Sequence, residues 1–232
     1  MTITFITGAN KGLGRETARR LIECGHTVLV GARNREQGEE TAAVLGARYV
    51  PIDVTNDASV AAAAADVAEH EGRVDVLINN AGVHGPAGDP SELTAADARA
   101  VLDVNVIGVV RTTTAFLPLL RRSEAPVIVN VSSGMGSLAL THDPDRPESH
   151  VIAPLYTSSK AALTMLTTQY AKGLQGIRVN AADPGYTATD LNGHSGPQTV
   201  IEGTDAIVAL ATEKPGAGTG RFLSRHGEIA WS

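Results

Sequence analysis

The sequence has few of the features that mark secreted or nucleic-acid-binding proteins. Its single cysteine, Cys24, excludes an intrachain disulfide and argues against a cysteine-based metal site, which favours a reducing compartment. The formal net charge is −6 at pH 7, and basic residues cluster only in short pairs such as Arg19–Arg20 and Arg121–Arg122. We therefore expect no nucleic-acid partner.

Signals for export or membrane insertion are also missing. The first residues, MTITFITGA, form neither a basic n-region nor an apolar h-region, and no uninterrupted apolar run approaches about 18 residues. The sequence contains no internal repeat and no long linker. We expect a cytoplasmic protein with no membrane partner.

Short β-branched runs alternate with longer alanine-rich stretches along the chain. The 232 residues, of which 43% are hydrophobic, fit one globular domain over 1–232. Strands are predicted at 2–7, 27–32, 48–53, 74–79, 126–132, 177–183 and 220–224, and helices at 13–24, 35–45, 57–70, 92–121 with a break near Asn105, 154–173 and 198–212. This alternation predicts an α/β, doubly wound Rossmann fold, with a seven-stranded parallel sheet in the order 3-2-1-4-5-6-7 and helices on both faces. Ligands should then bind outside the carboxyl ends of the strands.

A glycine-rich loop, TGANKGLG (7–14), joins the first strand to the first helix. Gly8, Gly12 and Gly14 permit a tight turn there and let a pyrophosphate approach the helix amino terminus. Their spacing is GxxxGxG and not GxGxxG, so the pattern alone is also compatible with an ordinary turn. The second strand ends at Arg33, where an NAD site commonly has an acidic residue for the ribose 2′-hydroxyl.

Arg33 and Lys11 are suited to a phosphate dianion. A guanidinium and an ammonium can both bind the 2′-phosphate of NADPH, whereas a carboxylate would repel it. We therefore predict NADP as the cofactor, with NADPH preferred over NADH. The alternative for Arg33 is a solvated loop charge.

Two further strand ends carry candidate cofactor contacts. Asp53 could accept a hydrogen bond from the adenine amino group, or it could instead form an Asx cap to the next helix. After the fourth strand, the small residues of Asn79-Asn80-Ala81-Gly82 let the backbone lie along the cofactor ribose, and the asparagine side chains can tie neighbouring strands together. As an isolated tetrapeptide this segment would simply be a turn.

Tyr156 and Lys160 lie four positions apart in YTSSK, about one helical turn, so both side chains should emerge on one face. A neighbouring cation favours the phenolate and moves the tyrosine pKa toward working pH, which makes the phenol a usable general acid or base. The alternative is an exposed Tyr–Lys pair on a helix surface.

Taken together, TGANKGLG, Asp53, NNAG, Asn105, Ser133, YTSSK and PGYTAT (184–189) resemble the short-chain dehydrogenase/reductase family from residue 2 to about 190. Within it, the Lys11–Arg33 combination and GARNREQG are most similar to NADPH-dependent carbonyl reductases. The resemblance implies an NADP-binding site that is formed by Gly8, Asn10, Lys11, Gly12, Leu13, Gly14, Arg33, Asp53, Val54, Asn80, Ala81, Gly82, Tyr156, Lys160, Pro184, Gly185, Thr187 and Thr189.

The same resemblance implies four catalytic residues. Tyr156 would protonate the carbonyl oxygen as hydride arrives from the nicotinamide, and Ser133 would hold that oxygen, although Ser132 could also be the donor. Lys160 would lower the Tyr156 pKa and bind the nicotinamide ribose. Asn105 would lie where a helix is distorted and a water relays protons to Lys160, unless it only bonds to local backbone. Pro184, Gly185 and Thr187 would contact the nicotinamide, and Thr189 the pyrophosphate.

The chain departs from the family pattern between Ser133 and Tyr156. The 22 residues at 134–155 form a longer connection than in many members, and we expect an inserted, solvated loop that flanks the substrate pocket. The spacing of its His142, Asp143, Asp145, Glu148 and His150 does not resemble a compact zinc motif, so no metal is expected. A substrate-gating role stays open for His84, His142 and His150. The brief segment 190–200 suggests an open pocket.

The sequence thus predicts an NADPH-dependent oxidoreductase that transfers hydride between nicotinamide and a ketone, aldehyde or quinone, with a small-molecule carbonyl or alcohol as substrate. The alternative is a redox-inert NADP(H)-sensing binding protein on the same fold. The intact set of Ser133, Tyr156 and Lys160 argues against it, because a binding module has no need for a cation beside a phenol. The sequence leaves open whether the protein is a monomer, a homodimer or a homotetramer.

Overall fold

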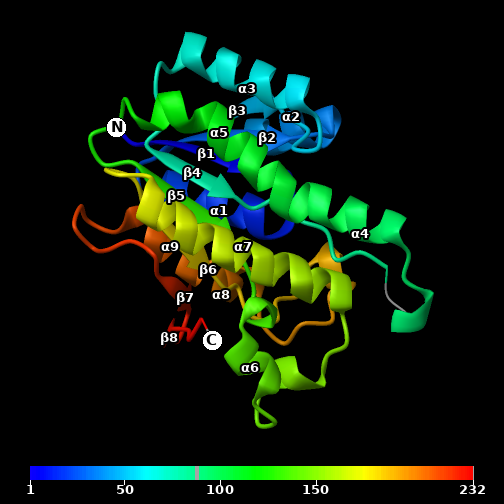
Figure 1. The fold of residues 1–232 in the computed structure, drawn as a ribbon. Coiled ribbons are helices and arrows are strands. Elements are labelled where there is room, and N and C mark those ends of the chain that lie inside the picture. Colours follow the sequence, from blue (N-terminus) through cyan, green and yellow to red (C-terminus); the bar gives the residue numbers. More distant parts are fainter. Residues whose placement is uncertain (87–88, 232) are drawn as a thin grey trace.

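A computed structural model describes residues 1–86 and 89–231, which fold around one twisted β-sheet (Figure 1). Its strands follow the order β3-β2-β1-β4-β5-β6-β7-β8, and neighbours from β3 to β7 are parallel. The strands are β1 (Ile3–Thr7), β2 (Thr27–Ala32), β3 (Arg48–Pro51), β4 (Val76–Asn79), β5 (Val127–Val131), β6 (Arg178–Ala182), β7 (Phe222–Ser224) and β8 (Gly227–Glu228). The predicted doubly wound order is confirmed.

The sheet has one more strand than the seven predicted. The eighth strand, β8, pairs antiparallel with β7 after a short turn. Gly227 has a φ of +120° at that turn, and the Ser224 hydroxyl accepts from the His226 amide. A two-residue strand carries too little side-chain alternation to be recognised in a sequence.

Helices cover both faces of the sheet. They are α1 (Gly12–Glu23), α2 (Arg35–Leu45), α3 (Asp57–His70), α4 (Ala95–Leu102), α5 (Gly108–Leu120), α6 (Leu138–His142), α7 (Pro154–Gly173), α8 (Val200–Gly203) and α9 (Asp205–Thr212). Shorter turns are η1 (Pro90–Glu92), the π-helical η2 (Asp103–Ile107), η3 (Gly134–Gly136), η4 (Pro147–His150) and η5 (Asp190–Asn192).

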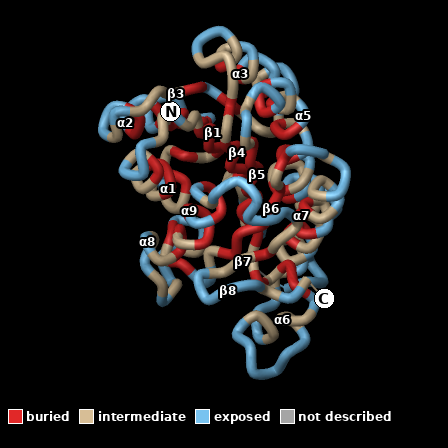
Figure 2. Tube along the Cα trace, turned by 90° about the vertical axis from the view of Figure 1, so that its left-hand side faces the viewer, coloured by how far each residue is buried: buried red, intermediate tan, exposed pale blue. Residues whose placement is uncertain are grey.

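Two predicted helices have different limits in the structure. The helix expected at 92–121 begins at Ala95, because Thr94 and Asp97 form a reciprocal capping box that fixes the first turn. The helix expected at 198–212 is divided into α8 and α9 at Thr204. The segment 134–155, predicted as a solvated loop, contains η3, α6 and η4, and α6 lies at the periphery of the molecule (Figures 1 and 2).

Adjacent residues of each strand pack into two separate hydrophobic cores, because their side chains point to opposite faces of the sheet. Ile6 belongs to the core beneath α1, α2 and α9, and Phe5 belongs to the core beneath α3, α5 and α7. Buried residues accordingly follow the strands and the inner helix faces in Figure 2. A parallel sheet buried on both sides brings its carboxyl strand ends to one edge, where the loops meet.

The stretch Ala95–Leu120, made of α4, η2 and α5, is the one helix of the described residues that is long and apolar enough to cross a membrane by length and composition. Its most apolar window has a mean hydropathy of 1.4, and 39% of that window is buried within the protein. Arg111 in this stretch forms an ion pair with Asp103, and α5 packs against α3 and β4. The expected absence of a membrane partner stays a prediction.

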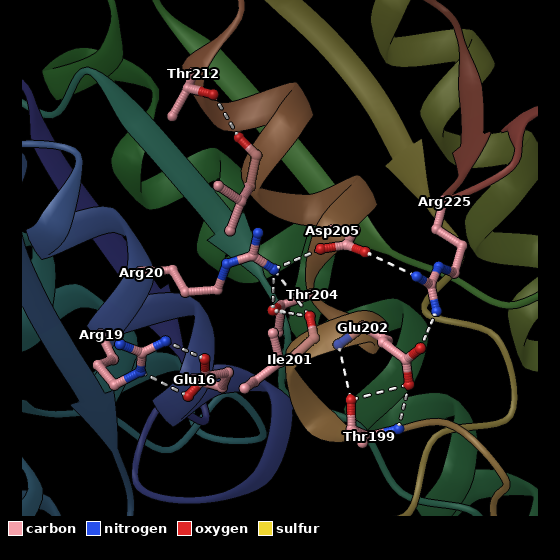
Figure 3. A network of polar contacts seen from close by, with 11 residues as sticks. Glu16, Arg19, Arg20, Thr199, Ile201, Glu202, Thr204, Asp205, Thr212 and Arg225 are labelled. Carbon is pink, nitrogen blue, oxygen red and sulfur yellow. Dashed lines mark hydrogen bonds and ion pairs between the residues drawn. The ribbon is translucent and has the colours of Figure 1, made fainter.

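An ion-pair network joins α8 and α9 to α1 (Figure 3). One Arg20 nitrogen donates to Asp205, Thr204 and the Ile201 carbonyl oxygen, each at 2.8 Å. On the other side, Arg225 pairs with Glu202 at 2.7 Å. These contacts fix α8 and α9, which follow the segment that contains the candidate cofactor contacts at 184–189.

Candidate active site

Ser133 and Tyr156 meet at the carboxyl end of β5. Ser133 follows that strand as the cap of η3, and its hydroxyl hydrogen-bonds to Tyr156 in the first turns of α7. Lys160 lies one turn further along α7, with its Nζ 5.5 Å from the centre of the Tyr156 ring. The three residues selected from the sequence are therefore brought together.

The structure also shows which of the two candidate serines contacts Tyr156. Ser132 is buried, and its hydroxyl lies 3.0 Å from Thr164 Oγ1 and donates to the Lys160 carbonyl oxygen at 3.4 Å. Those partners belong to α7 and place Ser132 in its packing surface. Ser133 is the serine that contacts the phenol.

The electrostatic setting of Tyr156 is opposite to the sequence prediction. Burial raises the pKa of Tyr156 to about 12, and the nearby Asp183 raises it further, against the lowering effect of the Ser133 hydrogen bond. Burial also lowers the pKa of Lys160 to about 8, although Asp183 opposes this shift. Lys160 Nζ donates to the Val131 carbonyl oxygen at 2.7 Å. In this structure Tyr156 is therefore a firmly protonated phenol, which is the form that can donate to a carbonyl oxygen.

Asn105 lies at the distortion that the sequence predicted. It is buried in the π-helical η2, and its side chain makes three hydrogen bonds to distant segments. Asn105 Nδ2 donates to the Val83 carbonyl oxygen at 2.8 Å and to Ser159 Oγ at 2.9 Å, and Oδ1 accepts from the Val83 amide at 2.8 Å. The alternative of purely local bonding is therefore wrong, and the proton-relay role stays a prediction.

The glycine loop forms the tight turn expected of it. Gly8 and Gly12 have φ angles of +65° and +53°, which favour glycine, and a Cβ at Gly14 would overlap the Gly8 carbonyl oxygen. Asn80 Nδ2 donates to the Thr7 and Gly8 carbonyl oxygens at 2.9 and 3.0 Å, which fastens the turn to the end of β4. The backbone at the start of α1 is thus open to a close-lying ligand.

Asn79 ties neighbouring strands together as predicted. Its Nδ2 donates to Asn130 Oδ1 on β5 at 2.9 Å, and Asn130 Nδ2 continues to Thr167 Oγ1 on α7 at 2.9 Å. This buried chain of amides connects β4, β5 and the helix that carries Tyr156. It fixes the relative height of the strand ends that bear the candidate site.

The two predicted phosphate-binding cations have separate carboxylate partners here. Lys11 Nζ lies 3.0 Å from Asp190 Oδ2, and Arg33 Nη1 lies 3.9 Å from Asp53 Oδ2. Both cations are well exposed, with 61% and 77% of the side-chain surface accessible, so these pairs are weak and free to rearrange. Sequence reasoning had assigned Lys11 and Arg33 to one phosphate and missed the acidic partner Asp190.

Asp53 forms an Asx turn, but it does not cap the next helix. Its Oδ1 accepts from the Thr55 amide at 3.0 Å and from the Thr55 hydroxyl at 2.7 Å, whereas α3 is capped by Asn56. Within the glycine loop, Asn10 Nδ2 donates to Gln37 Oε1 at 2.7 Å. The helix-cap alternative for Asp53 is therefore wrong, and the adenine contact stays a prediction.

The segment after β6 lies against the glycine loop. A Cβ at Gly12 would lie 3.8 Å from the Thr189 side chain, and Gly185 has a φ of +66°. Thr187 donates to the Pro184 carbonyl oxygen at 2.8 Å. The expected nicotinamide and pyrophosphate contacts at 184–189 thus lie on the same side of the molecule as the glycine turn.

Asp183 is a buried acid that the sequence reasoning missed. It directly follows β6 and accepts from the Gly185 amide at 3.0 Å and from the Gly134 amide, so it joins the loops that follow β5 and β6. Burial raises its pKa, and the nearby Glu148 from the 134–155 segment raises it further. Glu148 Oε2 is buried without a hydrogen-bond partner among the described residues. Only tertiary packing brings these carboxyl groups together.

Replacing Asp183 with Asn is expected to stabilise the protein at neutral pH. The raised pKa means that folding disfavours the charged form of Asp183. The ionised carboxyl group therefore begins to destabilise the protein as the pH rises above the ordinary pKa of 3.8, and this cost is complete once the pH exceeds the raised pKa. Urea unfolding of wild type and Asp183→Asn at acidic and neutral pH measures this gain. Asp190→Asn should show the opposite sign and a small size, because exposed Lys11 lowers the Asp190 pKa. Equal curves for Asp183→Asn and wild type at neutral pH would contradict the assignment.

A cleft among the described residues lies away from these groups. It has a volume of about 530 Å³ and is lined in part by Met1, His26, Arg73, Arg122 and Arg178 near the amino ends of the strands. Its arginines are already engaged: Arg73 with Asp75, Arg178 with Glu213, and Arg122 with the Gly72 carbonyl oxygen. The chemistry-bearing residues lie at the opposite, carboxyl edge of the sheet.

Comparison with known families agrees with this geometry. Residues 2–199 match the model of the short chain dehydrogenase family. The chain belongs to the short-chain dehydrogenase family. Its motif resemblance is thereby confirmed.

Individual short-chain dehydrogenases match over nearly the whole chain. The short-chain dehydrogenase anuI of Penicillium roqueforti is 39% identical over 224 residues, covering 91% of this chain and 88% of the relative. The (-)-isopiperitenone reductase of Mentha piperita is 32% identical, covering 97% of each chain. The NADPH-bound carbonyl reductase from chicken fatty liver superposes with a TM-score of 0.88 at 29% identity and covers 100% of both chains. This short-chain dehydrogenase is thus an oxidoreductase-family protein with a carbonyl reductase among its structural neighbours.

Proposed function

We propose that this short-chain dehydrogenase is an NADPH-dependent oxidoreductase that transfers hydride between the nicotinamide and the carbonyl group of a ketone, aldehyde or quinone. The observation that carries the proposal is the convergence of Ser133 and Lys160 on the half-buried phenol of Tyr156, at the carboxyl edge of a doubly wound sheet. Ligands of such sheets bind at this edge. The reductase names of the Mentha and chicken relatives support the same reaction class.

The residues present fit a dinucleotide. The positive φ angles of Gly8 and Gly12 and the absence of a side chain at Gly14 leave room for a pyrophosphate against the start of α1. Gly82 lies near Lys160, since a Cβ there would be 3.7 Å from Nζ, so backbone and ammonium can border the same ribose. Bound NADPH would supply the hydride.

Within this proposal the protein's own groups handle the proton. Tyr156 Oη donates its proton to the carbonyl oxygen as that oxygen gains electrons, and the Ser133 hydroxyl orients the same oxygen. The raised pKa of Tyr156 keeps the proton available at neutral pH. Lys160, with a pKa of about 8, lies close enough to stabilise the phenolate that is left and to help restore its proton.

The preference for NADPH rests on Arg33 and Lys11. Arg33 would exchange the half-buried Asp53 carboxylate, and Lys11 the exposed Asp190 carboxylate, for the 2′-phosphate. The phosphate carries more charge and accepts several hydrogen bonds. Weak exposed pairs are readily given up for such a partner. The segment 134–155 would border the substrate pocket, because its Glu148 reaches the Ser133 turn: a Cβ at Gly134 would lie 2.7 Å from Glu148 Oε1.

Replacing Arg33 with Ala should raise the dissociation constant for NADPH by about tenfold to a hundredfold, the effect of losing one charge-assisted contact, and leave that for NADH nearly unchanged. Quenching or enhancement of nicotinamide fluorescence measures both constants. Arg35→Ala is the matched control, because Arg35 is an equally exposed arginine that pairs with Glu39 in α2. An equal effect of Arg33→Ala on both cofactors would contradict the NADPH assignment.

The reaction itself is tested by adding a panel of ketones, aldehydes and quinones to the NADPH-bound protein and following the loss of the reduced nicotinamide. Oxidation by any of them supports the proposal and defines the substrate class. Tight binding without turnover across the panel would favour the redox-inert NADP(H)-sensing alternative. Failure to bind either cofactor would overturn both.

A further inference from the structure

His84 lies directly on the candidate catalytic phenol. Its imidazole stacks on the Tyr156 ring, with the ring centres 4.9 Å apart and the planes inclined by 18°. Of the three histidines that the sequence left open as gating residues, His142 bonds within its own helix to the Leu138 carbonyl oxygen. His84 is the one whose ring the structure places against Tyr156.

The backbone before His84 is held by a buried side chain. Asn105 bonds both the amide and the carbonyl oxygen of Val83, each at 2.8 Å. The same Asn105 side chain donates to Ser159 on α7, the helix that carries Tyr156. His84 and Tyr156 are therefore positioned from one shared anchor.

The backbone after His84 is also restricted. Gly85 has a φ of +83°, and a Cβ there would lie 2.6 Å from Val101 Cγ2 on α4. Both the conformation and the close approach require glycine. With Val83 held on one side and Gly85 on the other, the backbone that carries the His84 ring has little freedom.

The Tyr156 ring needs such a support. A phenol that donates a proton must keep Oη within hydrogen-bond reach of the carbonyl oxygen, and small displacements of a reacting group are costly to the rate. Ser133 holds the hydroxyl end of the side chain, and Lys160 Nζ lies 5.5 Å from the ring centre. Stacked aromatic rings have a preferred mutual orientation, so an imidazole face can hold the plane of the phenol.

We propose that His84 is a positioning residue for Tyr156, which keeps the phenol ring in the orientation that donates to the substrate carbonyl. This inference rests on the proposed reductase function. The role requires the flat aromatic face of residue 84 and not its ring nitrogens. A phenylalanine at this position should therefore keep the phenol ring positioned, whereas an alanine should not.

Steady-state kinetics of His84→Ala and His84→Phe test this role. We expect His84→Ala to lower kcat for carbonyl reduction about tenfold with little change in KM, because a misdirected phenol slows the chemical step. His84→Phe should stay within about twofold of wild type, since it keeps the stacked face. His70→Ala, at the exposed end of α3, is the control histidine. Unchanged kcat in His84→Ala, or equal loss in His84→Phe, would overturn the proposal.

A second readout does not depend on turnover. In protein labelled with ¹³C-tyrosine, the ring signal of Tyr156 is assigned among those of the four tyrosines by its loss in Tyr156→Phe. The stacked imidazole shields the Tyr156 ring, so His84→Ala should move this signal downfield and His84→Phe should leave it shielded. If the chemical shift of the Tyr156 ring signal is the same in His84→Ala as in wild type, the two rings do not stack. If wild type reduces no carbonyl, the reaction assignment fails while this spectrum still decides the placement of His84.

Discussion

Tyr156→Phe is expected to lower kcat for carbonyl reduction by about 10²–10⁴-fold, the usual contribution of a positioned general acid, while the dissociation constant for NADPH stays nearly unchanged. Phenylalanine keeps the ring that packs against His84 and removes only the hydroxyl that hydrogen-bonds to Ser133. The variant should therefore fold normally, bind cofactor and fail in the proton-transfer step. Loss of reduced nicotinamide with an active carbonyl compound measures kcat, and fluorescence titration measures binding.

The matched control for this variant is Tyr170→Phe. Tyr170 lies in the same helix, α7, and its pKa is likewise raised by burial, so the substitution removes a comparable hydroxyl away from the site. We expect wild-type turnover from it. If Tyr156→Phe also retained most of its turnover, Tyr156 could not be the proton donor.

Asn105→Ala is expected to lower the free energy of unfolding by about 2–4 kcal/mol and to impair carbonyl reduction as well. The substitution removes three hydrogen bonds and leaves the Val83 backbone and the Ser159 hydroxyl without these partners, and unsatisfied buried groups cost more than the bonds themselves contribute. It also releases the backbone that carries His84 toward Tyr156. Urea unfolding measures the stability, and the kinetic assay measures the accompanying loss of kcat.

Asn56→Ala separates these two consequences. Asn56 caps α3 through a hydrogen bond from the Ser59 amide at 2.9 Å, so its loss should cost about 1 kcal/mol with no change in kcat. A stability loss for Asn105→Ala no larger than that of Asn56→Ala would show that the three bonds are not important for the fold. Unchanged kcat in Asn105→Ala would show that the π-helical turn η2 has no role in carbonyl reduction.

Most secondary structure could be predicted because it depends on local patterns. The β-branched runs that became β1, β2 and β5 were located to within one residue or two, and the glycine turn at Gly8 and Gly12 was identified by residue type. Asn79 was also understood correctly, since an asparagine at a strand end has its neighbours at fixed spacing across a parallel sheet. The helix break at Asn105 and the choice of Ser133 as the partner of Tyr156 came from the family pattern.

Effects that depend on burial could not be predicted in the same way. Helical spacing correctly put Lys160 one turn from Tyr156, but the direction of the Tyr156 pKa shift is set by the amount of water excluded around the phenol. Lys11 and Asp190 are 179 positions apart in the sequence, so no local sequence pattern predicts their ion pair. The split between α8 and α9 and the short β8 likewise leave little trace in periodicity.

The sequence by itself therefore determined the doubly wound order, the glycine turn and the one-turn spacing of Tyr156 and Lys160. The first depends on the alternation of strands and helices along the chain, and the other two depend on local spacing within one loop or one helix. Only the tertiary structure decided that Ser133 and not Ser132 meets the phenol, that Asp183 and Glu148 lie together, and that His84 stacks on Tyr156. The physical reason is that packing and desolvation arise between segments remote in the chain. Their sign and size are fixed only when those segments meet.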